Sequence, residues 1–149
     1  MKFSPILILL FGCIFFTSAY AGTSNKNKMT RWYNKQQVKN GLKVYQKHCV
    51  GCHQPDAVGV KSWRYKDDNG VYPAPPLNGT AHTWHHPIDS LRQTILKGEK
   101  PKGGTMPGFA GKLNNRQVDE VLAWVQSHWS DDIYAAWLRK GKHSKRQRH

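Results

Sequence analysis

The segment HCVGCHQ, residues 48 to 54, places two cysteines and two histidines within six consecutive positions. The remainder of the 149-residue chain has one further cysteine, Cys13. Thiols and imidazoles this close together can hold a metal ion, close a disulfide or attach a haem. Each of the three needs different partners elsewhere in the chain, so the surrounding sequence decides among them and thereby decides the fold.

A zinc site or a disulfide explains this segment poorly. A zinc ion takes four ligands, commonly from a second cysteine pair or from two spaced histidines. The chain has no second CxxC pair, and the cysteines would have to recruit a histidine from a distant cluster, His82, His85 or His86. A disulfide between Cys49 and Cys52 closes too short a loop to stabilise much, and the βαβ pattern of redox-active CxxC proteins is absent.

Covalent haem attachment accounts for the whole CxxCH motif. Both thiols add to vinyl groups of the porphyrin, and the adjacent imidazole of His53 becomes an axial ligand of the iron. The motif also follows a predicted helix and precedes a long irregular stretch, which is uncommon in a compact domain unless it surrounds a ligand. We therefore expect one haem c, bound through Cys49 and Cys52.

The first 21 residues have the form of a secretory signal peptide. Lys2 precedes an apolar run that is too short to span a bilayer, and Ala19 and Ala21 are the small residues of a cleavage site. Cleavage after Ala21 would remove Cys13 and export the chain, which places it in the periplasm. The alternative is an uncleaved membrane anchor.

Basic residues outnumber acidic ones by 23 to 9, and the formal net charge is +14. Residues 139–149, RKGKHSKRQRH, contain six of the basic residues and no apolar face, so we expect a disordered basic tail. Residues 22–30 form a similar basic leader. In an exported protein this charge favours acidic redox partners, and through the tail an anionic membrane surface, over nucleic acid.

The residues between these basic ends, 31–138, show a helical spacing of apolar positions and no strand-like alternation. We expect an all-α domain of three to four helices and long loops. The first helix would run from Arg31 to His48. Its apolar face would be formed by Val38, Leu42 and Tyr45, beside Gly41. A glycine inside a helix costs about 1 kcal/mol relative to alanine, so Gly41 indicates close approach of another backbone or ring.

Three later helices are predicted, two of them from residues that commonly start or stop a helix. One lies between Pro87 and Gly98. The next begins at the N-cap Asn114, with Gln117 as its capping-box partner. A short last helix would cover residues 130–138, and the long stretch from residue 54 to residue 87 is predicted to be loop.

Met106 is the candidate for the second axial ligand. Met1 leaves with the signal peptide and Met29 lies in the basic leader, whereas Met106 lies in GGTMPGFAG between two predicted helices. Gly103 and Gly104 let the backbone approach a porphyrin closely. A histidine of the cluster named above is the alternative ligand.

With these elements in this order, the sequence resembles a class I c-type cytochrome from about Gln36 to Trp129. The resemblance rests on four segments, GLKVYQKHCVGCH, APPLNG, TMPGF and VDEVLAWVQSHW. It implies the cytochrome c fold, in which the first and last helices of the family cross. In this chain the crossing would place Gly41 and Tyr45 against Trp124.

The resemblance also implies contacts with the haem. A proline carbonyl of the family accepts a hydrogen bond from the axial histidine, and PPLNG assigns this role to Pro75, with Leu77 packing on the porphyrin. Such a bond would fix the tautomer of His53 and raise its basicity. Candidates for contacts with the haem propionates are His82, His85, His86, Trp84, Tyr72, Trp63 and Arg64.

An iron whose two axial positions are filled by protein leaves no site for a substrate, which favours electron transfer over catalysis. We therefore expect a one-electron carrier, not an enzyme, in a periplasmic or membrane-associated respiratory chain. Lysines around the site would steer acidic partners to it, namely Lys47, Lys61, Lys100 and Lys102. Two alternatives stay open: a haem sensor or peroxidase-like protein with a displaceable sixth ligand, and a haem subunit of a larger membrane oxidoreductase.

Overall fold

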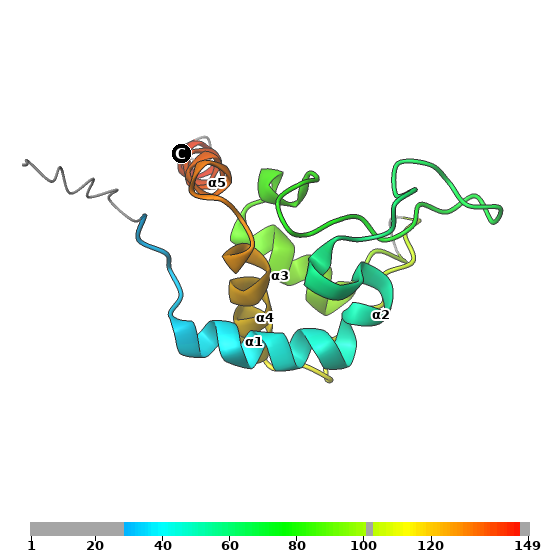
Figure 1. Cartoon of the computed structure of the whole chain (residues 1–149), viewed down its shortest axis with the longest axis horizontal. Helices are drawn as coiled ribbons and strands as arrows, with labels where there is room; N and C mark the ends of the chain where they lie inside the picture. Colours follow the sequence, from blue (N-terminus) through cyan, green and yellow to red (C-terminus); the bar gives the residue numbers. More distant parts are fainter. Residues whose placement is uncertain (1–28, 101–102, 147–149) are drawn as a thin grey trace, which may run out of the picture.

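The structure is a computed structural model that describes residues 29–100 and 103–146 (Figure 1). The expected signal peptide and most of the expected leader lie outside the described residues. The helices are α1 (Lys35–His48), α2 (Val50–His53), α3 (Ile88–Lys97), α4 (Asn115–Ser127) and α5 (Asp131–Arg146), and two 3₁₀ turns are η1 (Pro55–Ala57) and η2 (Thr83–His85). The described ranges contain no β-strand, which confirms the all-α prediction, and none of their helices is long and apolar enough to cross a bilayer.

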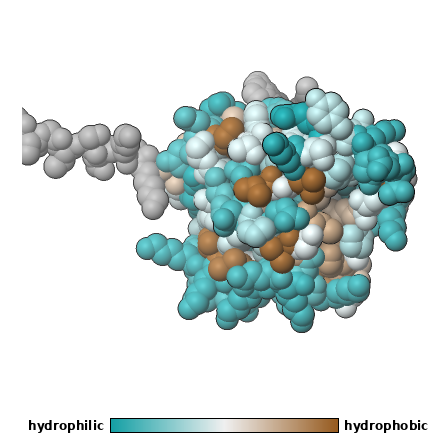
Figure 2. Space-filling model, turned by 45° about the vertical axis from the view of Figure 1, so that its right-hand side comes forward, coloured by the Kyte–Doolittle hydropathy of each residue, from teal (hydrophilic) through white to brown (hydrophobic). Residues whose placement is uncertain are grey.

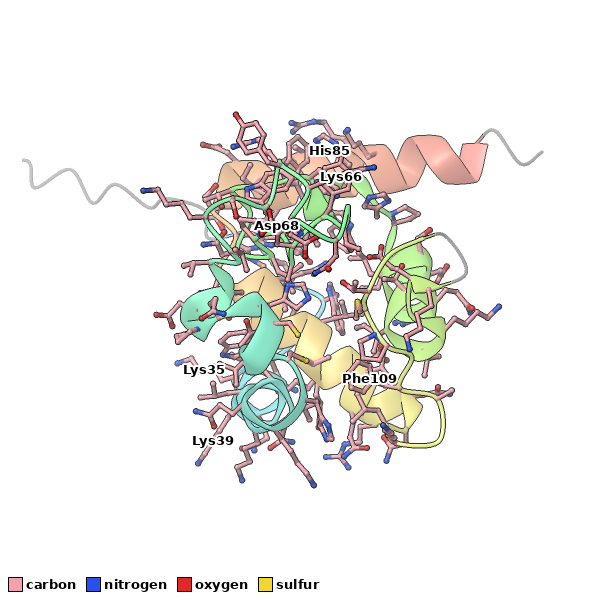
Figure 3. The ribbon with its side chains drawn as sticks, turned by 90° about the vertical axis from the view of Figure 1, so that its right-hand side faces the viewer. Lys35, Lys39, Lys66, Asp68, His85 and Phe109 are labelled. Atoms are coloured by element: carbon pink, nitrogen blue, oxygen red, sulfur yellow. The ribbon has the colours of Figure 1, made fainter. Side chains whose placement is uncertain are left out.

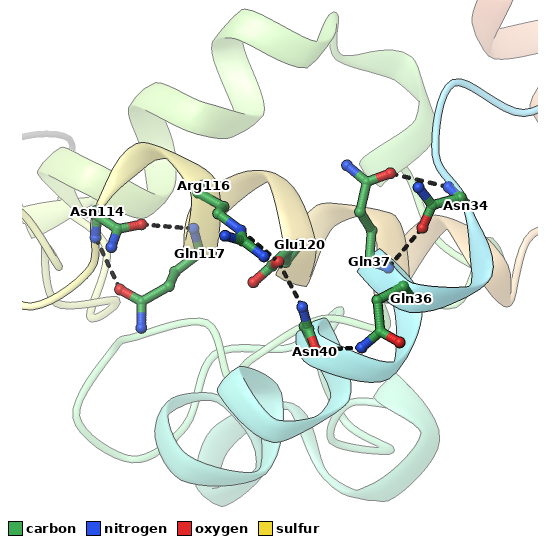
Figure 4. A network of polar contacts seen from close by, with 8 residues as sticks. All are labelled: Asn34, Gln36, Gln37, Asn40, Asn114, Arg116, Gln117 and Glu120. Atoms are coloured by element: carbon green, nitrogen blue, oxygen red, sulfur yellow. Dashed lines mark hydrogen bonds and ion pairs between the residues drawn. The ribbon is translucent and has the colours of Figure 1, made fainter.

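Capping boxes start both α1 and α4. The side chain of Asn34 accepts a hydrogen bond from the backbone N–H of Gln37 (3.0 Å), and the side chain of Gln37 accepts one from Asn34 in return (3.0 Å). Asn114 and Gln117 repeat this arrangement at the start of α4 (Figure 4). The predicted start of α4 is confirmed, whereas α1 begins after Asn34 rather than at residue 31, because this cap fixes where the helical backbone starts.

Gly41 allows α1 and α4 to cross in direct backbone contact. A Cβ atom at this position would overlap the carbonyl of Glu120 and lie 2.9 Å from the Cβ of Trp124. Beside the crossing, the rings of Tyr45 and Trp124 have centroids 4.0 Å apart. The predicted contacts of Gly41 and Tyr45 with Trp124 are therefore present. The predicted burial of Leu42 is wrong: its side chain is 37% exposed, and Val44 is buried instead.

A polar network joins α1 to α4 next to this crossing. Glu120 is 5% exposed, and its carboxylate accepts hydrogen bonds from Asn40 Nδ2 (2.8 Å) and Arg116 Nε (3.0 Å). Asn40 in turn accepts a hydrogen bond from Gln36 (Figure 4). The buried carboxylate is thus satisfied from both helices, which fixes their register.

The segment after α3 folds back along that helix. α3 lies between Pro87 and Gly98, as predicted. The N–H groups of Phe109 and Ala110 donate to carbonyls of the last turns of α3, at 3.0 Å each. These bonds anchor the carboxyl-terminal end of the loop that carries Met106, residues 98–109, which we call the methionine loop.

α5 differs from the expected short helix followed by a disordered tail. It continues through residues 139–146 to Arg146. Asp131 and Asp132 lie in its first turn, where negative charge favours a helix start. Tyr134 and Trp137 are buried against the rest of the molecule, so tertiary contacts anchor a helix whose basic end has no apolar face.

Candidate functional site

A cavity of about 1350 Å³ is lined by the CxxCH segment and by residues 73–77, which we call the proline segment. η2, α3, the methionine loop and α4 complete its lining. Its volume exceeds the roughly 300–1,000 Å³ of ordinary small-molecule pockets, so it suits a large ligand. All six residues predicted to contact the haem line this cavity, namely Cys49, Cys52, His53, Pro75, Leu77 and Met106.

One helical turn brings the CxxCH side chains together. α1 ends at His48, and α2 continues the chain as a single turn in which His53 N–H donates to the carbonyl of Cys49 (2.9 Å). Positions three and four apart in such a turn share a face, which is how Cys49, Cys52 and His53 reach the same cavity. Both thiols are free, and Cys52 is the more exposed. Burial, followed by the effect of Cys52, raises the pKa of Cys49 to about 11, so this thiol keeps its proton at neutral pH.

His53 is held by the proline segment. It is 8% exposed, and its Nδ1 atom lies 3.0 Å from the carbonyl oxygen of Pro75. Nδ1–H donates in this contact, which leaves Nε2 with the lone pair that binds a metal. Burial lowers the pKa of His53, although the Pro75 carbonyl and Glu99 oppose this shift. The imidazole is therefore neutral at pH 7, the form in which histidine is a ligand.

Gly59 lets the chain after the motif hold the proline segment in place. Its φ is +66°, and a Cβ atom there would lie 2.5 Å from the carbonyl carbon of Pro75. Its N–H donates to the carbonyl of His53 (2.8 Å), and two residues earlier the carbonyl of Ala57 accepts from Leu77 N–H (2.8 Å). Residues 57–59 therefore fix both the backbone of His53 and the proline segment that its imidazole bonds.

Met106 lines the same cavity from the loop after α3 and is half-buried. Its carbonyl accepts a hydrogen bond from Glu99 N–H (3.0 Å). At Gly98, where φ is +72°, a Cβ atom would lie 2.5 Å from that carbonyl, so the close packing of this turn requires glycine. The thioether is thus carried by a backbone that is fixed to the end of α3.

The seven candidates for propionate contacts separate into two groups. Five line the cavity, namely Trp63, Arg64, Tyr72, His82 and His86. His85 and Trp84 do not. Their rings contact each other at 4.0 Å, and Figure 3 shows His85 on the α5 side of the molecule, far from the cavity residue Phe109. Partial desolvation, followed by Lys140 and His82, lowers the pKa of His85.

Neighbouring rings among the cavity-lining candidates contact one another in tilted and edge-on arrangements. The ring centroids of Trp63 and His82 are 5.6 Å apart, and those of His82 and His86 are 5.9 Å apart. The guanidinium of Arg64 lies 4.4 Å from the centre of the Trp63 ring. One wall of the cavity therefore offers a cation and two imidazoles, which suit carboxylate groups of a ligand.

A zinc site is not assembled in the part of the chain that the structure describes. No group of three or more His, Cys, Asp or Glu side chains there has an arrangement that could hold a metal ion. Cys49, Cys52 and His53 share their cavity with Met106, whose thioether is a donor typical of haem iron and not of zinc.

Six further apolar side chains of the lining suit a porphyrin face. α3, α4 and the methionine loop contribute Leu91, Ile95, Phe109, Val121, Leu122 and Val125. Figure 2 shows apolar residues in the middle of one face of the molecule, with hydrophilic residues around them. Free thiols, a neutral imidazole and a thioether are the donors that a covalently bound haem needs, so the residues present fit this group.

Sequence reasoning missed several lining residues. The apolar face of α4 supplies Val121, Leu122 and Val125, which the helical spacing assigned to a core without indicating a ligand. Glu99 also lines the cavity. The hydroxyl of Tyr45 donates to the carbonyl of Gln54 (2.6 Å) and so ties α1 to the turn after the CxxCH motif, a contact for which the sequence carries no signal.

Comparisons with known proteins agree with this chemistry. Residues 36–125 match the family described as cytochrome c oxidase, cbb3-type, subunit III. Among curated proteins the chain is similar to a nicotinate dehydrogenase subunit of Pseudomonas putida (strain KT2440), with 30% identity over 99 residues. The match covers 64% of this chain and 8% of that relative, so the chain spans less than a tenth of the relative's length. No solved structure matches the chain.

Proposed function

The chain belongs to the family of c-type cytochrome domains described as cytochrome c oxidase, cbb3-type, subunit III, and from this premise we propose that it is a one-electron carrier with a single haem c. The observation that carries the proposal is the cavity in which a CxxCH turn, a proline carbonyl and a methionine converge. The all-α arrangement is that of the cytochrome c fold.

Four side chains would hold the haem. Cys49 and Cys52 would attach the haem covalently through their thiols, and His53 and Met106 would supply the nitrogen and sulfur ligands of its iron. When bound, the haem supplies one iron that exchanges a single electron between its ferrous and ferric states. Pro75 keeps the proton of His53 on Nδ1, and Leu77 with the apolar face of α4 excludes water. Thioether ligation and burial both raise the reduction potential.

Mass determination and an optical spectrum of the purified exported protein test this proposal. We expect the mass of the mature chain plus one haem, and a weak long-wavelength band in the ferric protein that reports sulfur ligation. Met106→Ala should abolish that band, whereas Met29→Ala should leave it unchanged, because Met29 packs on the core outside the cavity lining. A chain without bound haem, or a band that survives Met106→Ala, contradicts the proposal.

The reactivity of the same preparation separates the carrier from a haem sensor or peroxidase-like protein. Such a protein would need an iron position that a small ligand or peroxide reaches readily. In the carrier, the methionine loop, which is fixed to the end of α3, would hold the thioether as an iron ligand. Rapid formation of a cyanide complex or turnover of peroxide by the wild-type protein would favour the sensor or peroxidase.

We place the carrier in the periplasm, with acidic redox partners. c-Type cytochrome domains are usually exported, and the signal peptide expected at residues 1–21 accounts for export here. Of the lysines expected to steer partners, Lys47, Lys61 and Lys100 are exposed, and Lys102 lies outside the described residues. An anionic membrane surface is a second target for the basic end of α5. Cell fractionation that finds the mature protein in the cytoplasm would contradict this placement.

A second candidate function is that of a haem subunit in a larger oxidoreductase. The observation that favours it is the similarity to a small part of a nicotinate dehydrogenase subunit. In that case the chain would accept electrons inside a complex instead of diffusing between partners. Isolation of the native protein under mild conditions tests this: a stable complex with a dehydrogenase favours the subunit, and a monomer favours the diffusing carrier.

A further inference from the structure

Residues outside the family match, on both sides of it, pack on one another. Arg31 Nη2 donates to the carbonyl of Trp129 (3.1 Å), and its guanidinium lies 4.1 Å from the centre of the Tyr134 ring. The backbone N–H of Trp32 donates to the hydroxyl of Tyr134 (3.1 Å). The amino-terminal arm and the start of α5 therefore form one unit, which we call the clasp and define as residues 29–34 and 129–137.

The clasp is also fixed to the end of α4. The indole N–H of Trp32 donates to Oε1 of Gln126 (2.7 Å). Gln126 is fully buried and Tyr134 is 1% exposed. Because these groups lie away from water, the loss of either contact would leave a buried polar atom without a partner. The clasp is thus joined to α4 by a hydrogen bond to a buried side chain.

Two indole N–H groups of the clasp reach the wall of the cavity. Trp129 Nε1 donates to the carbonyl of Leu77 (2.8 Å), and Trp137 Nε1 donates to the carbonyl of His86 (2.9 Å). These carbonyls stand at the two ends of residues 77–86. The cavity lining takes four side chains from this segment, namely Leu77, His82, Thr83 and His86.

The segment 77–86 rests on the clasp between these two bonds as well. At Gly79, where φ is +97°, a Cβ atom would lie 3.2 Å from the indole ring of Trp129 and 3.6 Å from Ile133. η2, which includes His85, contacts α5 directly, and Lys140 Nζ lies 4.9 Å from the centre of the Trp84 ring. One face of the segment thus packs on the clasp while the other lines the cavity.

We propose that the clasp is a positioning device for the haem: Trp129 and Trp137 set the wall formed by residues 77–86 against the porphyrin and keep water out on that side. This inference rests on the proposed function, since it requires a haem in the cavity. Solvent exposure of a haem lowers its reduction potential, because water stabilises the extra charge of the ferric state. A loosened wall should therefore be measurable both as mobility and as potential.

Trp137→Phe in the full-length, haem-loaded protein tests the proposal. Phenylalanine keeps an aromatic ring in the packing and removes the N–H donor. Amide hydrogen exchange of residues 77–86 should become roughly 2- to 12-fold faster, the factor that corresponds to one ordinary hydrogen bond. The midpoint potential should fall. Leu138→Ala is the matched control, because Leu138 is the next residue of α5 and is 36% exposed, and it should change neither quantity.

Arg31→Gln is a second variant that acts from the arm, outside the cavity lining. This variant should change amide hydrogen exchange and midpoint potential in the same direction as Trp137→Phe, because it removes the contacts of Arg31 with Trp129 and Tyr134. The proposal is overturned if Trp137→Phe leaves the potential at the wild-type value, or if exchange rises equally over the whole chain. Absence of haem from the wild-type protein would instead overturn the proposed function, so the two failures are distinguishable.

Discussion

At the scale of single residues, Gly41 gives the sharpest prediction. Gly41→Ala should destabilise the protein by about 1–3 kcal/mol, because the new methyl group meets the backbone carbonyl of Glu120, which no change of rotamer can move. Gly141→Ala is the control: it also lies in a helix, and nothing stands within 4 Å of its added Cβ. It should be neutral or stabilise by up to about 1 kcal/mol. Denaturant unfolding measures both, and a Gly41→Ala variant as stable as wild type would contradict the crossing.

The CxxCH residues could be predicted from the sequence because covalent chemistry requires them to be adjacent. The contact of His53 with Pro75 followed from the family resemblance. The direction of loop side chains could not be predicted. His82 and His86 line the cavity and His85 does not, since a segment without regular period gives no signal about which way each imidazole points. Leu42 was misplaced for a related reason, because an apolar residue at the edge of a helical face fits either assignment.

At the scale of elements, the contact between α1 and α4 depends on the buried carboxylate of Glu120. Asn40→Leu removes one of its two donors and should cost about 1–3 kcal/mol, the cost of leaving a buried polar group under-bonded. Adding Glu120→Gln should recover part of this loss, since a neutral amide is cheaper to bury than a carboxylate. Gln36→Ala, an exposed member of the same network, should change stability by less than about 0.5 kcal/mol. Denaturant unfolding gives these differences, and equal losses for Asn40→Leu and Gln36→Ala would contradict this account.

Elements with local end signals were predicted closely. α3 lies between its proline and glycine, and α4 begins at its capping box. α2 and the length of α5 were not predicted. α2 is a single turn, too short to show a period, and α5 extends into a segment whose composition alone favours disorder. Two buried residues of α5 make its long-range contacts: Tyr134 contacts the amino-terminal arm, and Trp137 contacts residues 77–86. Both segments are distant from α5 in sequence.

At the scale of the whole molecule, the all-α class followed from helical spacing, but the clasp did not. Arg31 meets Trp129 across 98 positions, and neither residue belongs to a motif that would indicate the other. Long-range polar contacts of this kind depend on how the helices pack, and a sequence shows them only after the packing is known. The domain therefore includes residues on both sides of the matched family region.

The charge distribution of the whole molecule leads to a prediction about association rates. Among the residues whose side chains the structure describes, every ion pair uses an arginine as its cation, so the lysines remain available to a partner. Four exposed lysines follow one another at steps of four along α1, namely Lys35, Lys39, Lys43 and Lys47, and lead to the CxxCH motif; Figure 3 shows the first two side by side. Like charges at this spacing repel one another, and an acidic surface would relieve that repulsion.

Oxidation of the ferrous protein by a small trianion, ferricyanide, should therefore slow about tenfold as the Debye length falls from about 30 Å at 0.01 M salt to about 8 Å at 0.15 M. Oxidation by a trication, tris(phenanthroline)cobalt(III), should accelerate over the same range, because the salt screens repulsion instead of attraction. Lys39→Glu combined with Lys43→Glu should weaken both dependences while the optical spectrum stays unchanged. Stopped-flow measurement gives these rates for both proteins. A salt dependence that is absent, or of the same sign for both oxidants, would show that these lysines do not steer association.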